Sequence, residues 1–199
     1  MDMTESKLLN SFNDDVVKGD YGESWTVEAY KKLKGISLFK CDTAAHRNLD
    51  IDFTNDYNIS ICDDVDTIKN TDSLLIEVKT DYSEFKNQCI EVVSNTNTNS
   101  KGWALVTEAK YIVSVFPNLN RVYVYDGKKF REYAEKICND DSVKTVKLNT
   151  ASYNGKKLYN TIIKLVRRKT LFDLGIILEI YDMTSFQCLY RKDNVNHIH

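Results

Sequence analysis

One eight-residue stretch constrains this chain more than any other. Residues 74–81 read LLIEVKTD, an apolar run interrupted by two charged residues, Glu77 and Lys79. Alternate residues of a β-strand point to the same face, so a strand here projects both charges from one face. A carboxylate ligates hard divalent cations, and a neighbouring ammonium orients a water or balances the charge of a phosphoryl group. The stretch therefore predicts a buried strand that carries reactive groups.

A second acidic segment distinguishes this pair from the acid-x-lysine tripeptides at four other positions of the chain. Residues 48–53 read NLDIDF, which predicts a short strand with Asp50 and Asp52 on its polar face. In an antiparallel register that sets Asp52 opposite Glu77, Asp50 lies opposite Lys79. Like charges directly opposite on a sheet are destabilising, and a bound metal ion is the simplest remedy. Together the two segments predict a divalent-metal site.

These residues resemble the PD-(D/E)XK nuclease superfamily. Its pattern is a helix with a glutamate, a strand with a metal-binding aspartate and a strand with Glu-x-Lys, which here correspond to Glu23, to Asp52 or Asp50, and to Glu77 with Lys79. The resemblance covers about residues 20–126 and is greatest to small phage or mobile-element members. The chain departs from the pattern in two ways, because no proline precedes either aspartate and the insert between the acidic strands is long.

The resemblance implies a restriction-endonuclease-like α/β fold, with a central mixed sheet flanked by helices. It implies a Mg²⁺-dependent nuclease, either an endonuclease or an exonuclease, with Mn²⁺ as a substitute cation and with nucleic acid, expected to be DNA, as the substrate. Lys79 would position the attacking water. The implied catalytic residues are Asp52, Glu77, Lys79, Asp50 and Glu23, and the implied metal ligands are Asp52, Glu77, Asp50 and the carbonyl of Val78. The alternative is a nuclease-like scaffold that binds nucleic acid or a partner protein without cutting it.

Composition and charge set the wider frame. A chain of 199 residues with 42% hydrophobic residues is long enough for one good core, so we expect a single domain. Its nuclease-like core would span about residues 20–126, with a basic, helical extension over about 127–199. The net charge is −2, but residues 1–100 carry −9 and residues 101–199 carry +7. This asymmetry favours metal ligands in the first half and phosphate contacts in the second.

Candidate nucleic-acid contacts are suggested by that asymmetry. Lys101 and Trp103 flank a glycine and are suited to a phosphate and a base, although Trp103 fits a hydrophobic core equally well. Basic residues then concentrate in residues 156–169, where a solvated surface is the competing interpretation. The candidates in this segment are Lys156, Lys157, Lys164, Arg167, Arg168 and Lys169.

Other features argue against further classes of protein. No apolar run approaches the ~20 residues of a membrane span, and the acidic N-terminus is unlike a secretion signal, so we expect a cytoplasmic protein. Five cysteines without Cys-x-x-Cys spacing and three histidines argue against zinc and predict buried, reduced thiols. The acidic residues of 55–73 lack the glycine and final glutamate of a calcium loop, which favours a solvated insertion.

Local patterns predict the remaining elements. Asp20 is a good helix N-cap for residues 20–34, which leaves Glu23 two roles, metal ligand or capping residue. We expect Gln88 and Glu91 to face the site from a strand over 89–94. Asp126 should cap a helix over 127–138. Further strands are expected over 36–39, 104–106, 111–116, 121–125, 143–148 and 159–166, with a helix over 158–166 as the alternative for the last of them. A final helix over 170–181 has an apolar stripe that would dock on the core or on a second subunit.

Overall fold

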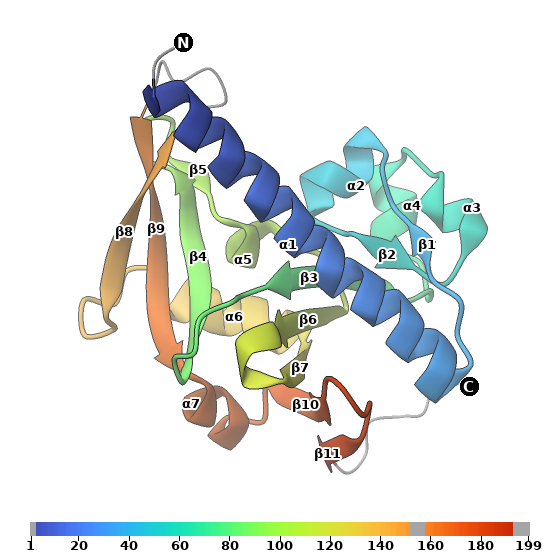
Figure 1. The fold of residues 1–199 in the computed structure, drawn as a ribbon. Coiled ribbons are helices and arrows are strands. Elements are labelled where there is room, and N and C mark those ends of the chain that lie inside the picture. The colour runs from blue at the N-terminus through green and yellow to red at the C-terminus, as the bar shows by residue number, and fades with distance from the viewer. Residues whose placement is uncertain (1–2, 152–157, 193–199) are drawn as a thin grey trace.

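The computed structural model describes residues 3–151 and 158–192, which form two β-sheets with helices packed against them (Figure 1). The larger sheet has seven strands in the order β1-β2-β3-β6-β7-β10-β11. Only the β3–β6 pair is parallel among the described strands of this sheet, so the protein has the expected mixed sheet flanked by helices. Its strands are β1 Phe39–Lys40, β2 Phe53–Thr54, β3 Leu75–Thr80, β6 Tyr111–Phe116, β7 Arg121–Asp126, β10 Ile177–Asp182 and β11 Cys188–Arg191.

Strand β3 confirms the prediction made for residues 74–81, and its register with β2 is also the predicted one. Phe53 pairs with Ile76 and Thr54 with Leu75, so continuing the same register places Asp52 opposite Glu77. The expected strand over residues 48–53 is wrong at its start, however. Helix α2, Ala44–Leu49, which Thr43 caps, takes the first two residues of that segment, and Asp50 ends the helix in the left-handed region at φ 51°.

Helix α1, Met3–Lys34, runs diagonally across one face of the larger sheet (Figure 1). It is a single helix, so Asp20 lies in its interior and the expected N-cap there is wrong. Gly35, at φ +68°, ends the helix as expected. The close approach of α1 to β3 depends on Gly22, because a Cβ at this position would lie 2.1 Å from the hydroxyl of Thr80 on β3.

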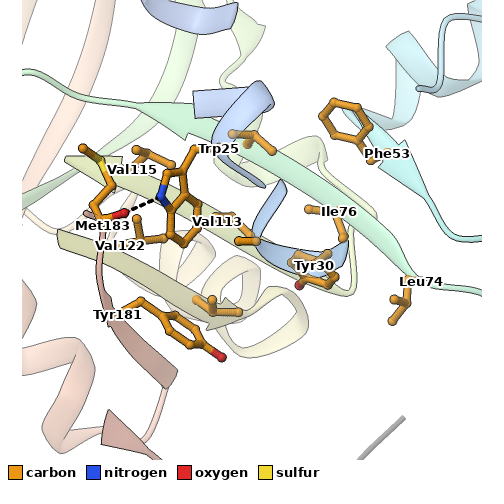
Figure 2. Packing of buried hydrophobic residues seen from close by; sticks show 13 residues of the cluster. Trp25, Tyr30, Phe53, Leu74, Ile76, Val113, Val115, Val122, Tyr181 and Met183 are labelled. Carbon is orange, nitrogen blue, oxygen red and sulfur yellow. Dashed lines mark hydrogen bonds between the residues drawn. The ribbon is translucent and has the colours of Figure 1, made fainter. Parts of the chain in front are cut away.

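The core beneath α1 is largely apolar and includes the aromatic side chains of Trp25, Tyr30, Phe53 and Tyr181. Trp25 and Tyr30 of the helix pack on Ile76 of β3, and Tyr181 of β10 closes the far side (Figure 2). The indole Nε1 of Trp25 donates a hydrogen bond of 2.8 Å to the carbonyl of Met183, so the buried indole is satisfied. This packing fixes α1 on the sheet face formed by the even-numbered residues of β3.

The other face of the larger sheet is covered by the second layer. Its four strands have the order β5-β4-β9-β8 and pack with helices α5, α6 and α7 around Ile90, Tyr125 and Phe130. Asp126 caps α6 by accepting from the amide of Lys129, as predicted. The bounds are β4 Asn87–Asn95, β5 Ser100–Lys101, β8 Thr145–Ala151, β9 Leu158–Arg167, α5 Trp103–Val106, α6 Gly127–Ile137 and α7 Arg168–Asp173.

Several expected elements are corrected by the structure. Residues 103–106 form helix α5, not a strand, and the hairpin of β6 and β7, joined by the 3₁₀ turn Pro117–Leu119, lies within the sheet instead of closing it. The final helix over 170–181 is wrong, since α7 ends before Gly175, at φ +65°, and β10 begins at Ile177. Strands β9 and β10 pair with β4 and β7, so much of the expected C-terminal extension belongs to the two sheets, with helix α7 between these strands.

The insertion of residues 55–73 is also more ordered than expected. Its aspartates act as caps: Asp56 begins helix α3, Tyr57–Ser60, and Asp64 begins helix α4, Val65–Lys69. Ile68 is fully buried and belongs to a third apolar cluster with Leu75. Asp56 and Asp64 therefore mark helix starts, although most side chains of the insertion are exposed or half-buried, in keeping with the expected solvated insertion.

All five cysteines are free thiols, although only Cys41 is buried and Cys188 is exposed, so the expectation of buried thiols is only partly met. Among the described residues, no helix is long and apolar enough to cross a membrane.

Candidate active site

Glu77 and Lys79 project from the face of β3 opposite α1, as their spacing predicts. The ammonium of Lys79 contacts Oε1 of Glu77 and lies 5.1 Å from the ring centroid of Trp103 on α5. The Glu77 carboxylate is 1% exposed, whereas the side chain of Lys79 is 33% exposed. The pair therefore joins a buried anion to a cation that reaches solvent.

Asp50 reaches this pair although it does not lie on a strand. Its Oδ2 is 3.7 Å from the Lys79 ammonium. The hydroxyl of Thr107 donates to the main-chain carbonyl of Asp50 at 2.9 Å, which helps to hold the left-handed residue in place. The sequence predicted that Asp50 and Lys79 would meet, but through strand pairing and not through a helix C-terminus. No sequence signal pointed to Thr107.

In the pairing with β3, the side chain of Asp52 takes the hydrogen bond that its main-chain carbonyl would otherwise accept. Its amide donates to the Ile76 carbonyl at 2.9 Å, as a ladder residue would, but its own carbonyl accepts from Cys41 at 2.8 Å. The carboxylate Oδ2 therefore accepts from the amide of Val78 at 2.7 Å. This fixes one oxygen of Asp52 beside the Glu77–Lys79 pair. Val78 itself pairs with Val113 of β6.

Glu23 and Glu91 approach the cluster from different elements. Glu23, on α1, forms an ion pair of 2.7 Å with Lys40, and its charge acts on Asp52. A capping role for Glu23 is excluded because it lies inside the helix. Glu91, on β4, accepts from the amide of Trp103 at 3.4 Å and interacts electrostatically with Lys79, as the sequence led us to expect.

Gln88, expected to face the site beside Glu91, lies instead in the core. Its amide oxygen accepts from the hydroxyl of Tyr125 at 2.6 Å. Residues 88 and 91 are three apart, and strand alternation therefore points them to opposite faces.

Burial dominates the electrostatics of the acidic cluster. Desolvation raises the pKa of Glu77 well above its ordinary value; Asp52 and Asp50 raise it further, while Lys79 opposes the shift. The pKa of Asp52 is raised chiefly for the same reason. Burial by itself would lower the pKa of Lys79, but the surrounding carboxylates outweigh it and raise that pKa. Lys79 is therefore a fixed cation among carboxylates that resist ionisation.

The cost of burying the ionised Glu77 carboxylate predicts that Glu77→Gln stabilises the protein when no metal is present. Folding raises the pKa of the Glu77 carboxyl, so above pH ~4.5 this group stays protonated in the native protein over a pH range in which it is ionised in the unfolded chain. The free energy of unfolding of the protein therefore falls as the pH rises through this range. In EDTA at pH 7.5, Glu77→Gln should raise the free energy of unfolding by on the order of 1 kcal/mol or more. The gain should disappear near pH 4.

Urea unfolding of the parent and of Glu77→Gln at both pH values measures this effect. The exposed Glu84→Gln variant, from another acid-x-lysine tripeptide, is the control and should change stability little at either pH. A loss of stability in Glu77→Gln at pH 7.5 would contradict the prediction.

The structure divides the predicted nucleic-acid contacts. Arg168 is buried, and its guanidinium donates to the carbonyls of Asn87 at 2.7 Å and of Phe85. Lys164 is also buried and donates to the Asp140 carbonyl at 2.8 Å. Both side chains have structural roles, so the prediction that they contact phosphate was wrong. A run of basic residues in the sequence does not show which of their side chains point into the core.

The other predicted contacts keep accessible side chains or lie outside the described residues. Lys101 and Arg167 are exposed, and Lys169 is exposed but pairs with Asp173 at 2.8 Å. Trp103 is partly buried and stacks on Phe130, which fits the expected core role, and Lys79 lies over its ring. Its contact with a base stays a prediction. Lys156 and Lys157 lie outside the described residues.

Within the described residues, no three side chains of the His, Cys, Asp and Glu types are gathered as around a metal ion. The acidic cluster nevertheless contains oxygens suited to a cation. Oε1 of Glu77 contacts only the Lys79 ammonium, whereas Oε2 of Glu77 and Oδ2 of Asp50 accept no hydrogen bond from the described part of the chain, and all three oxygens are buried. Such oxygens are costly without a donor or a cation.

Comparisons of the chain with protein-family models, with curated proteins and with solved structures find no match.

Proposed function

We propose that this protein is a metal-dependent nuclease with a restriction-endonuclease-like core that hydrolyses phosphodiester bonds, with DNA as the expected substrate. The observation that carries the proposal is the convergence of Asp50, Asp52 and Glu77 around Lys79, where two buried carboxylate oxygens, Oε2 of Glu77 and Oδ2 of Asp50, accept no hydrogen bond from the described residues. A purely structural cluster would normally satisfy such oxygens. Their retention favours a role in binding a cation.

The donor set is that of a hard cation such as Mg²⁺ or Mn²⁺. Asp52 and Glu77, with Asp50 and the carbonyl of Val78, would hold it, while Glu23 acts on Asp52 from outside and pairs with Lys40. When bound, the cation activates water and offsets charge on the phosphate. Mg²⁺ commonly takes only one or two carboxylates and relies on water and substrate phosphate for the rest, so three gathered side chains are not required.

Lys79 has two functions in this proposal. In the metal-free protein its ammonium contacts Glu77 and offsets the charge of the carboxylates. With metal and substrate bound, the same ammonium is free to orient the attacking water and to stabilise charge on the phosphate. The ammonium lies 5.1 Å from the centroid of the Trp103 ring, and the side chain is 33% exposed, so its head is accessible.

The absence of three gathered ligands in the described residues keeps one alternative open, a scaffold that binds nucleic acid or a partner protein without cutting it. A scaffold that only binds has no need for a Glu77–Lys79 pair. The two proposals therefore differ in whether the protein cleaves nucleic acid in the presence of metal.

The decisive experiment incubates the protein with single-stranded, duplex and branched DNA and with RNA, in Mg²⁺, in Mn²⁺ and in EDTA. We expect cleavage of at least one DNA substrate in either cation and none in EDTA. Asp52→Asn is the matched variant, because it preserves shape while removing the charge, and it should cut at least about 10²-fold more slowly. Binding without cleavage under every condition would favour the scaffold.

A further inference from the structure

A second concave region lies outside the acidic cluster. It is a pocket of about 620 Å³ beside the start of helix α6, lined on its apolar side by Leu75, Ala109 and Leu178. Segment 107–109 separates it from the acidic cluster: Thr107 bonds to Asp50 on one side, while Ala109 lines the pocket on the other. Its basic lining residues are Lys69, Lys110, Lys128, Lys129, Arg131 and Lys192.

The pocket is strongly positive even after its internal ion pairs are considered. Two carboxylates, Glu108 and Asp126, line it together with six basic side chains. Glu108 lies 3.2 Å from both Lys69 and Arg131, and Asp126 lies 3.7 Å from Lys129. A net excess of four positive charges therefore remains on its lining. This is unusual in a chain whose net charge is −2.

Two of the lysines are held by neutral groups. The ammonium of Lys110 donates to the Thr71 carbonyl at 2.7 Å, and that of Lys192 donates to the Gly175 carbonyl at 2.8 Å. No carboxylate of the described residues lies within ion-pair distance of either ammonium. These carbonyls orient the lysines without neutralising them. Partial burial lowers the pKa of Lys110, and the charge of Asp72 opposes this shift only in part.

We propose that this basic pocket binds a phosphate-bearing ligand, either a free polyphosphate compound or the terminal phosphate of a nucleic-acid strand. Multiply charged phosphate matches an excess of four positive charges better than a single carboxylate does. Lysines bind phosphate as point charges, and the Arg131 fork adds planar donors. Leu75 and Glu77 point to the same face of β3 about 7 Å apart, so a strand end in the pocket would lie near the acidic cluster.

The test measures binding in EDTA, so that it does not depend on cleavage. The probes are inorganic tripolyphosphate and two oligonucleotides of one sequence, one with a 5′-phosphate and one with a 5′-hydroxyl, each titrated calorimetrically into the full chain. Lys110→Gln/Lys192→Gln should weaken binding of the relevant probe by tenfold or more and flatten its salt dependence. Lys86→Gln/Lys147→Gln, at two exposed lysines away from the pocket, is the control.

The pattern of losses identifies the ligand. If only tripolyphosphate is affected, the pocket takes a free compound; if the 5′-phosphate oligonucleotide binds more tightly than its 5′-hydroxyl form and loses that advantage in the variant, it takes a strand end. Because the probes are titrated in EDTA, where the proposed nuclease does not cut, the outcome of this test and the outcome of the cleavage experiment are independent of each other. Unchanged binding in the pocket variant would overturn it.

A charge reversal protects the test against misfolding. Lys128 is 79% exposed, so Lys128→Glu should melt like the parent and still weaken binding of the relevant probe. Parent-like binding by folded Lys128→Glu, together with parent-like binding by the lysine double variant, would assign the pocket no phosphate role.

Discussion

Replacing Lys79 with methionine should reduce metal-dependent cleavage at least about 10²-fold while the protein stays folded. Methionine keeps an unbranched apolar stem beside Trp103 but removes the ammonium that contacts Glu77 and lies near Asp50. Under the proposed mechanism the lost group orients water and offsets phosphate charge. The carboxylates remain, so metal affinity, measured by calorimetry, should change much less than the cleavage rate.

The kinetics distinguish this role from a structural one. Loss of a group that acts in the transition state lowers kcat and kcat/KM together, whereas loss of simple substrate binding raises KM. Lys86→Met is the control, because Lys86 also comes two residues after an acid but is exposed. Circular dichroism and melting curves verify the fold of both variants. A folded Lys79→Met protein that cuts at the parent's rate would refute the assignment.

Arg168→Ala should lower the free energy of unfolding by roughly 3–5 kcal/mol, the largest stability effect that we predict. The guanidinium donates to the carbonyls of Asn87 and Phe85 and lies 4.3 Å from the centre of the Phe116 ring. Alanine leaves these acceptors without their donor and opens a cavity beneath β4. It also removes a cation–π contact, which is worth about 1 kcal/mol or more when desolvated.

The neighbouring arginine is a closely matched control. Arg167 precedes Arg168 in the chain but is exposed, so Arg167→Ala should change stability by no more than about 0.5 kcal/mol. Urea unfolding of the two variants measures the contrast directly. Equal effects from the two substitutions would show that the buried contacts of Arg168 contribute little.

Strand periodicity and pairing arithmetic were sufficient to predict the central part of the site. Because strand side chains alternate and antiparallel partners keep a constant sum of residue numbers, one apolar run and one acidic segment predicted that Asp52 would lie opposite Glu77. The structure has this register. Local capping chemistry predicted helix α6 from Asp126 equally well, since the cap acts within one turn.

Local patterns were insufficient wherever the neighbours of a residue come from distant segments. Asp50 lies near Lys79 because helix α2 ends in a left-handed residue held by Thr107, which is 57 residues away. The run over residues 170–181 has a helical stripe, but Gly175 ends the helix, and the second half of the run becomes strand β10 because it pairs with β7.

Charge shows most clearly what only the tertiary structure decided. The sequence by itself determined that basic residues concentrate in the second half of the chain and that acidic residues surround the Glu77 strand. It did not determine that Arg168 points into the core or that Lys110 and Lys192 share a pocket. Whether a charge faces solvent, a carbonyl or a ligand depends on which strands pack beside it. That packing is set by burial of apolar surface across the whole chain, which no local pattern records.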